Sequence, residues 1–159
     1  SRRQRQMCIR DRLYTGGHAD NPEFFELLQQ NDAHVAYDNT GFGPRAADVL
    51  ICEDGDPLEA IINYYFEEKP AATRQMGTQV ERMERLLDLV KQYKADGVVA
   101  SRLYMCDLWA FEHFLMRKRL HENNVPFLEL EVDYTPEGQG QIKTRVQAFV
   151  ESLADRQTA

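Results

Sequence analysis

Cys106 is the residue of this 159-residue chain whose type and position best suit chemistry. It lies between a short apolar segment, expected to be a strand, and the start of an expected helix. The positive end of a helix dipole favours a thiolate at such a position. That thiolate could be a nucleophile, a redox group or a metal ligand, whereas a packed, inert cysteine is the common fate of a lone thiol. From the residues alone these interpretations stay open.

Gly17, His18 and Arg45 are further candidates because they lie in segments rich in turn-forming residues that follow two expected strands. His18 is interpreted either as a catalytic group or as an ordinary polar loop residue. Cys52 is predicted to be structural, since the neighbouring Glu53 and Asp54 disfavour a thiolate. His113 lies on an expected helix and is predicted to be a surface or structural residue.

Several familiar motifs are absent. The sequence has no phosphate-binding loop of the Gly-x-x-x-x-Gly-Lys type, no Gly-x-Ser-x-Gly elbow and no Cys-x-x-Cys pair. Residues 41–43 (Gly-Phe-Gly) lack the third glycine of a dinucleotide fingerprint. The four histidines show no spacing typical of metal ligands.

Composition excludes several classes of protein. The chain is 43% hydrophobic and 28% charged, which is typical of one globular domain. Its net charge of −7 argues against nucleic acid or an anionic membrane as a partner. No apolar run reaches the roughly 18–20 residues of a membrane span. Three widely spaced cysteines do not resemble a secreted disulfide framework, so a cytoplasmic location is expected.

Residues 1–12 (SRRQRQMCIRDR) differ from the rest, with five arginines and one acid. A transit peptide or a nucleic-acid-binding arm would fit, but the string is similar to translated sequencing-adapter sequence. We interpret it as a non-native leader and expect residues 13–159 to form the domain, as the back part of a longer protein.

Short apolar segments alternate with helical patterns along the remaining chain. Strands are expected near residues 12–16, 33–37, 97–101 and 126–132. Helices are expected after Pro22, from Asp56 with an apolar face through Phe66, over residues 73–94, after Asp107 and through residues 142–153. This alternation predicts an α/β fold, Rossmann-like (flavodoxin-like), with a four-stranded parallel sheet in the order 2-1-3-4 and helices on both faces. The active crevice is expected at the carboxyl ends of the strands.

Three segments occur in an order that identifies a family: residues 95–109, containing Cys-Asp-Leu-Trp, residues 126–134, ending in Asp-Tyr, and residues 141–151, containing Gln-Ile-Lys-Thr-Arg. The pattern, with the Asp-Gly-Asp-Pro-Leu block at residues 54–58, resembles the C-terminal domain of the D component of 2-hydroxyacyl-CoA dehydratases. These proteins are relatives of benzoyl-CoA reductase. The resemblance covers residues 13–153 and does not separate the two activities.

The resemblance implies a lyase that removes water from an (R)-2-hydroxyacyl-CoA through a ketyl radical, under anaerobic conditions. It implies a [4Fe-4S] cluster held by three cysteines, of which Cys106 is the metal ligand supplied here and two belong to an N-terminal lobe outside this chain. It also implies a second homologous subunit and an ATP-dependent iron–sulfur activator protein. Gly17, His18 and Arg45 are then expected to contact the acyl-CoA substrate. This fragment alone is expected to be inactive.

The sequence departs from the family at Asn39 and Thr40, where many relatives have a cysteine, so contacts of that loop with substrate are expected to differ. Three other functions stay open. One is a benzoyl-CoA reductase-type subunit that transfers electrons to an aromatic acyl-CoA. The others are a flavodoxin-like module for a nucleotide or flavin, and a non-enzymatic interaction domain.

Overall fold

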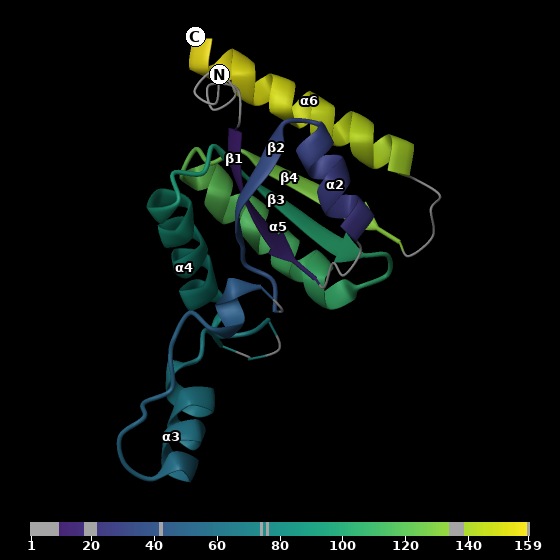
Figure 1. Ribbon diagram of the computed structural model, residues 1–159. Coiled ribbons are helices and arrows are strands. Elements are labelled where there is room, and N and C mark those ends of the chain that lie inside the picture. Colours follow the sequence, from purple (N-terminus) through teal and green to yellow (C-terminus); the bar gives the residue numbers. More distant parts are fainter. Residues whose placement is uncertain are drawn as a thin grey trace.

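The computed structural model describes residues 10–17, 22–41, 43–73, 75, 77–133 and 139–158 (Figure 1). One sheet is formed by the strands β1 (Arg10–Gly16), β2 (Ala33–Asp38), β3 (Gly97–Leu103) and β4 (Phe127–Val132). Its order is β2-β1-β3-β4, and each neighbouring pair is parallel. The predicted α/β class, the strand order and the four strand positions are therefore confirmed.

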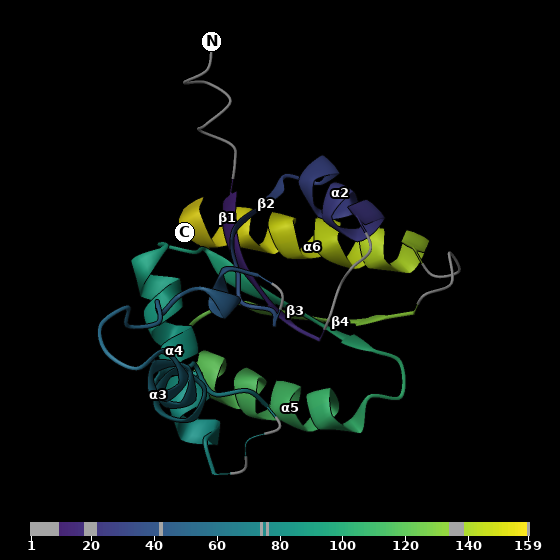
Figure 2. The same ribbon diagram turned by 60° about the horizontal axis from the view of Figure 1, so that its bottom comes forward.

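Helices cover both faces of the sheet (Figure 2). One face is covered by α2 (Pro22–Gln30) and α6 (Gln139–Thr158), and the other by α4 (Gln79–Gln92) and α5 (Asp107–Glu122). Side chains of β3 alternate between these layers: Val98 and Ala100 pack with α4 and α5, whereas Val99 packs with α2 and α6. Because both faces are buried, the strand is continuously apolar, and this made it visible in the sequence.

Strand β1 begins at Arg10, so the predicted leader boundary after residue 12 falls inside the sheet. Arg12 is 0% exposed, and its Nη1 lies 3.4 Å from Asp96 Oδ2. The Asp11 amide donates to the same carboxylate at 3.2 Å. Residues 10–12 therefore belong to the fold. Charged residue types concealed this, because apolar patterning does not assign an arginine to a core. Residues 1–9 lie outside the described residues.

Two helices differ from their predicted lengths. The helix expected over residues 73–94 begins only at Gln79, because Gly77 in the left-handed region (φ 83°) interrupts it. The helix expected from Asp56 is α3 (Pro57–Asn63), and it continues as a π-helical turn, η2 (Tyr64–Glu68). Asp56 Oδ1 accepts hydrogen bonds from the Leu58 and Glu59 amides at 2.8 and 3.2 Å, so Asp56 is the N-cap of this helix.

Residues 49–69, which include α3 and η2, form an arm that extends away from the sheet (Figure 1). The arm leaves the body shortly after a short 3-10 helix, η1 (Pro44–Ala46), and returns at Pro70, ahead of α4. In the described ranges no helix is both long enough and apolar enough to cross a membrane.

Candidate functional site

The carboxyl ends of β1 and β3 meet so closely that only glycine fits between them. Gly16 has φ 129°, and a Cβ there would lie 2.0 Å from the Ser101 carbonyl oxygen. The Gly17 amide donates to that same oxygen at 2.9 Å. The chain leaves β1 toward β2 on one side, while β3 lies on the other, so this is the switch point at which open α/β sheets bind ligands.

Trp109 of α5 lies beside this glycine pair. A Cβ on Gly17 would be 3.5 Å from Trp109 Cδ1 and Nε1, an ordinary van der Waals contact. The indole is half-buried and also packs against the core between the sheet and α4. The structure thus brings Gly17, a predicted substrate contact, against an aromatic ring from the element that begins at Cys106.

Cys106 is the N-cap residue of α5, directly after the turn that ends β3. Met105 in that turn has φ 62°, and the Cys106 amide donates to the Leu103 carbonyl at 3.1 Å. The free thiol is half-buried and makes no capping hydrogen bond to the helix. The structure therefore places Cys106 where the sequence predicted, at the carboxyl edge of the sheet, with a thiol that the helix does not use.

Exposed apolar side chains precede and follow Cys106 in the sequence. Tyr104 and Met105 in the turn are exposed, as are Leu108, Phe111 and Phe114 on α5. Apolar side chains thus occupy both the inner and the outer side of α5, as in helices that are buried all round. Exposed apolar surfaces of this kind are typical of sites of interaction with another molecule or segment.

Arg45, the other described residue predicted to contact substrate, binds backbone instead. Its Nη2 donates to the carbonyl oxygens of Pro70 at 3.2 Å and Ala71 at 2.5 Å. Burial, and then the charges of Arg85 and Arg82, lower the pKa of its guanidinium. Arg45 therefore fixes the point at which the arm rejoins the body.

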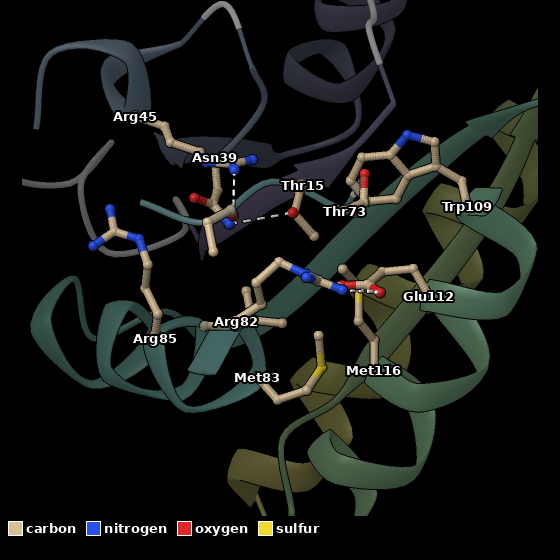
Figure 3. Close-up of a pocket in the computed structure, with 12 residues that line it drawn as sticks. Thr15, Asn39, Arg45, Thr73, Arg82, Met83, Arg85, Trp109, Glu112 and Met116 are labelled. Atoms are coloured by element: carbon tan, nitrogen blue, oxygen red, sulfur yellow. Dashed lines mark hydrogen bonds and ion pairs between the residues drawn. The ribbon is translucent and has the colours of Figure 1, made fainter. Parts of the chain in front are cut away.

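Arg82 and Glu112 form a buried ion pair next to it (Figure 3). Arg82 Nε and Nη2 each lie 2.8 Å from one Glu112 oxygen, and the two side chains are 8% and 4% exposed. Arg82 Nη1 also donates to the carbonyl oxygens of Ala72 and Gln75. With these donors used, the guanidinium links α4, α5 and the segment after the arm.

The cavity between these groups is small (Figure 3). Its volume of about 20 Å³ is close to the space that one water molecule needs. Its lining includes Thr15, Asn39, Arg45, Arg82 and Trp109. A ligand much larger than a water molecule does not fit in it, so the described residues form no closed pocket for a large ligand here.

His113, which the sequence predicted to be a surface or structural residue, is buried and therefore structural. It is 0% exposed, lies between Trp109 and Phe127, and has Nδ1 3.5 Å from Glu129 Oε1. Burial lowers the pKa of its imidazole, despite the opposing charge of Glu129. The signal was present in the spacing: residues 109, 113, 116 and 120 follow the inner face of one helix.

Two candidate residues remain, His18 and Cys52. His18 lies outside the described residues. Cys52 is exposed on the arm, where its thiol lies 3.8 Å from the Asp54 carbonyl oxygen, so it is not a core residue. Within the described ranges, no group of three or more His, Cys, Asp or Glu side chains could hold a metal ion. Cys106 is therefore at most one ligand of a site completed elsewhere.

Comparison with known proteins shows the family to which the chain belongs. Residues 10–153 match the family model "2-hydroxyglutaryl-CoA dehydratase, D-component". A candidate dehydratase subunit of Escherichia coli, YjiM, is 30% identical over 120 residues, covering 75% of this chain and 30% of that protein. The (R)-phenyllactyl-CoA dehydratase beta subunit of Clostridium sporogenes is 24% identical over 145 residues, covering 89% of this chain and 37% of that protein.

A third relative, the beta subunit of (R)-2-hydroxyglutaryl-CoA dehydratase from Acidaminococcus fermentans, is 26% identical over 140 residues, covering 83% of this chain and 36% of that protein. The chain belongs to the 2-hydroxyglutaryl-CoA dehydratase D-component family. It spans about a third of the length of the relatives that it matches.

Proposed function

We propose that this chain is the C-terminal α/β domain of a cytoplasmic iron–sulfur subunit of a 2-hydroxyacyl-CoA dehydratase. The single observation that carries the proposal is the position of Cys106 within the family match: a free thiol at the carboxyl edge of the sheet. The named relatives are dehydratase subunits, which favours dehydration over ring reduction. The substrate class is an (R)-2-hydroxyacyl-CoA.

The donor set fits one corner of a [4Fe-4S] cluster. Cys106 contributes a soft thiolate ligand of the type that such clusters use, and the described residues contain no second thiol at this edge. The other ligands therefore come from the part of the subunit outside this chain. A bound cluster would supply one-electron chemistry: an electron from an ATP-dependent activator would be lent to the substrate thioester, the 2-hydroxyl would leave as hydroxide and a β-proton would be lost, and the electron would then be returned, so that the net reaction is loss of water.

This chain's own residues position and shield that chemistry. Gly16 and Gly17 keep backbone, rather than side chains, at the ends of β1 and β3, so substrate can approach the sheet edge. Trp109 lines one side of this edge of the sheet. The apolar side chains of Tyr104, Met105 and Leu108 exclude water once the rest of the enzyme covers them.

The test is a pair of cysteine variants of the complete subunit, assembled with its partner subunit and activator. Cys106→Ser should retain the circular dichroism of the fold, because the residue lies at the rim of the core. Iron per subunit should fall sharply, since serine is a poor ligand for iron–sulfur clusters. Dehydration should be abolished with it. Cys52→Ser, which changes an exposed thiol, should retain normal iron and turnover.

Normal iron and turnover in Cys106→Ser would contradict the assignment of Cys106 as a cluster ligand. The 159-residue chain by itself should bind no intact cluster after anaerobic treatment with iron and sulfide, because it holds one of the required ligands. A stoichiometric cluster on this chain alone would contradict the proposed division of ligands.

A further inference from the structure

The arm carries an apolar stripe that is left uncovered by the part of the chain that the structure describes. Five large side chains, each between 43% and 78% exposed, make up the stripe: Leu58, Ile61, Ile62, Tyr65 and Phe66. Their positions follow the spacing i, i+3, i+4, i+7 and i+8, which aligns side chains along one face of a helix. The same spacing characterises helices that dock into grooves.

The arm is held out from the body by a fixed base. Where it leaves, Asp48 accepts a hydrogen bond of 2.5 Å from the Tyr37 hydroxyl and pairs with Arg85. Where it returns, Arg45 holds the carbonyl oxygens of Pro70 and Ala71. The Asp56 cap fixes the start of its helix. An arm ordered before binding loses little conformational entropy on docking.

The charge of the arm indicates which kind of surface covers it. Residues 50–69 contain six acids and one lysine, a net charge of −5. The whole chain has a net charge of −7. A second copy would bring like charges together, which disfavours self-association. The complementary surface is an apolar groove with lysine and arginine side chains along its rim.

We propose that the arm docks the subunit to its dehydratase partner by inserting this stripe into an apolar, basic-rimmed groove of that partner. The inference rests on the proposed function for the existence of the partner subunit. The arm extends away from the sheet beyond α4 (Figure 1), whereas Cys106 lies at the start of α5.

The experiment measures affinity between the complete subunit and its partner. Ile62→Asp places a charge in the middle of the stripe and should raise the dissociation constant about tenfold or more. Val80→Asp is the matched control, because Val80 is 73% exposed on α4, outside the arm, and it should change the constant less than about twofold. Circular dichroism should be the same for both variants.

A second variant tests the charge argument. Glu67→Lys/Glu68→Lys reverses two exposed acids beside the stripe and should weaken binding. It should also reduce the dependence of affinity on salt, because fewer opposite charges then face the rim. An unchanged dependence of affinity on salt would contradict the proposal that the groove has a basic rim.

A photo-reactive amino acid at position 62 identifies the occupant directly. A cross-link to the partner subunit is the expected result. A cross-link between two copies of this subunit, or to another segment of the same subunit, would overturn the proposal, as would unchanged affinity in Ile62→Asp. If the arm variants leave an assembled, active dehydratase, only the docking role fails. If the wild-type subunit holds no iron and binds no dehydratase partner, both proposals fail.

Discussion

The arm and its base, the part of the body from which it leaves and to which it returns, differ in which side chains are buried. Each is the reverse of the usual pattern. At the base, the charged groups of Arg82, Glu112 and Arg45 are buried or partly buried and bind one another or backbone carbonyls. In the arm, large apolar residues such as Ile62 and Phe66 are exposed. The base needs fixed, directional contacts to hold an outgoing segment, which charged hydrogen bonds supply. The arm instead presents the apolar surface that the docking proposal assigns to the partner.

Breaking the buried pair should have the largest effect on stability. Arg82→Met leaves Glu112 as an unpaired buried carboxylate, so the free energy of unfolding should fall by about 3–5 kcal/mol. Chemical denaturation of the 159-residue chain measures it. Arg82→Met/Glu112→Leu should recover part of the loss because no lone charge remains. The exposed pair of Arg119 and Glu84 provides the control, and an equal loss in Arg119→Met would contradict the distinction.

Removing the clamp on the returning segment should have an intermediate effect. Arg45→Ala leaves the Pro70 and Ala71 carbonyl oxygens without their donor, at an expected cost of about 1–3 kcal/mol. Hydrogen exchange at the amides of residues 71–73 should accelerate. Unchanged exchange there would mean that Arg45 does not hold the base, and would return it to the residues available for substrate.

Loss of the helix cap should act only within the arm. Asp56→Ala removes the acceptor for two amides and should destabilise α3 locally by about 1 kcal/mol. Faster exchange of the amides in α3 measures this effect, while global unfolding should stay unchanged. Asp54→Ala is the matched control, because it removes a nearby carboxylate outside the cap. Equal effects of the two variants would point to charge rather than capping.

The smallest effect is expected from the stripe itself. Ile62→Asp should change the stability of the isolated chain by less than about 0.5 kcal/mol, because the side chain is already exposed to water. The same substitution should strongly weaken assembly. If the free energy of unfolding of the isolated chain fell by about 2 kcal/mol or more, the stripe would be covered within the chain. The contrast between an exposed arm and a buried base would then be wrong.

The sheet was predictable because its strands are buried on both faces. Val98, Val99 and Ala100 form a continuous apolar run, and such runs between helical patterns specify parallel strands. The rule that ligands bind at the carboxyl ends of strands then placed Gly17 and Cys106 at one edge. Both deductions need only local pattern and general topology.

The remaining features depend on which surfaces meet, which a sequence pattern does not encode. Periodicity identified the apolar face from Leu58 to Phe66 but could not tell whether the same chain covers it. Arg12 entered the core because Asp96 and the Phe149 ring lie beside its guanidinium, an arrangement created by tertiary contacts. Arg45 turned toward backbone carbonyls that are 25 and 26 residues away, so its partners could not be found locally.

The acids of the arm also bear on the solubility of the chain while the stripe is uncovered. Charged residues next to an apolar segment act as gatekeepers against aggregation. At neutral pH the net charge of −7 keeps separate molecules apart. As the pH falls toward the isoelectric point near 5.1, this repulsion fades while the stripe stays exposed. Mild acidity is therefore the condition under which we expect this chain to precipitate while nothing covers the stripe, and neutral solution is the condition under which we expect it to stay dispersed.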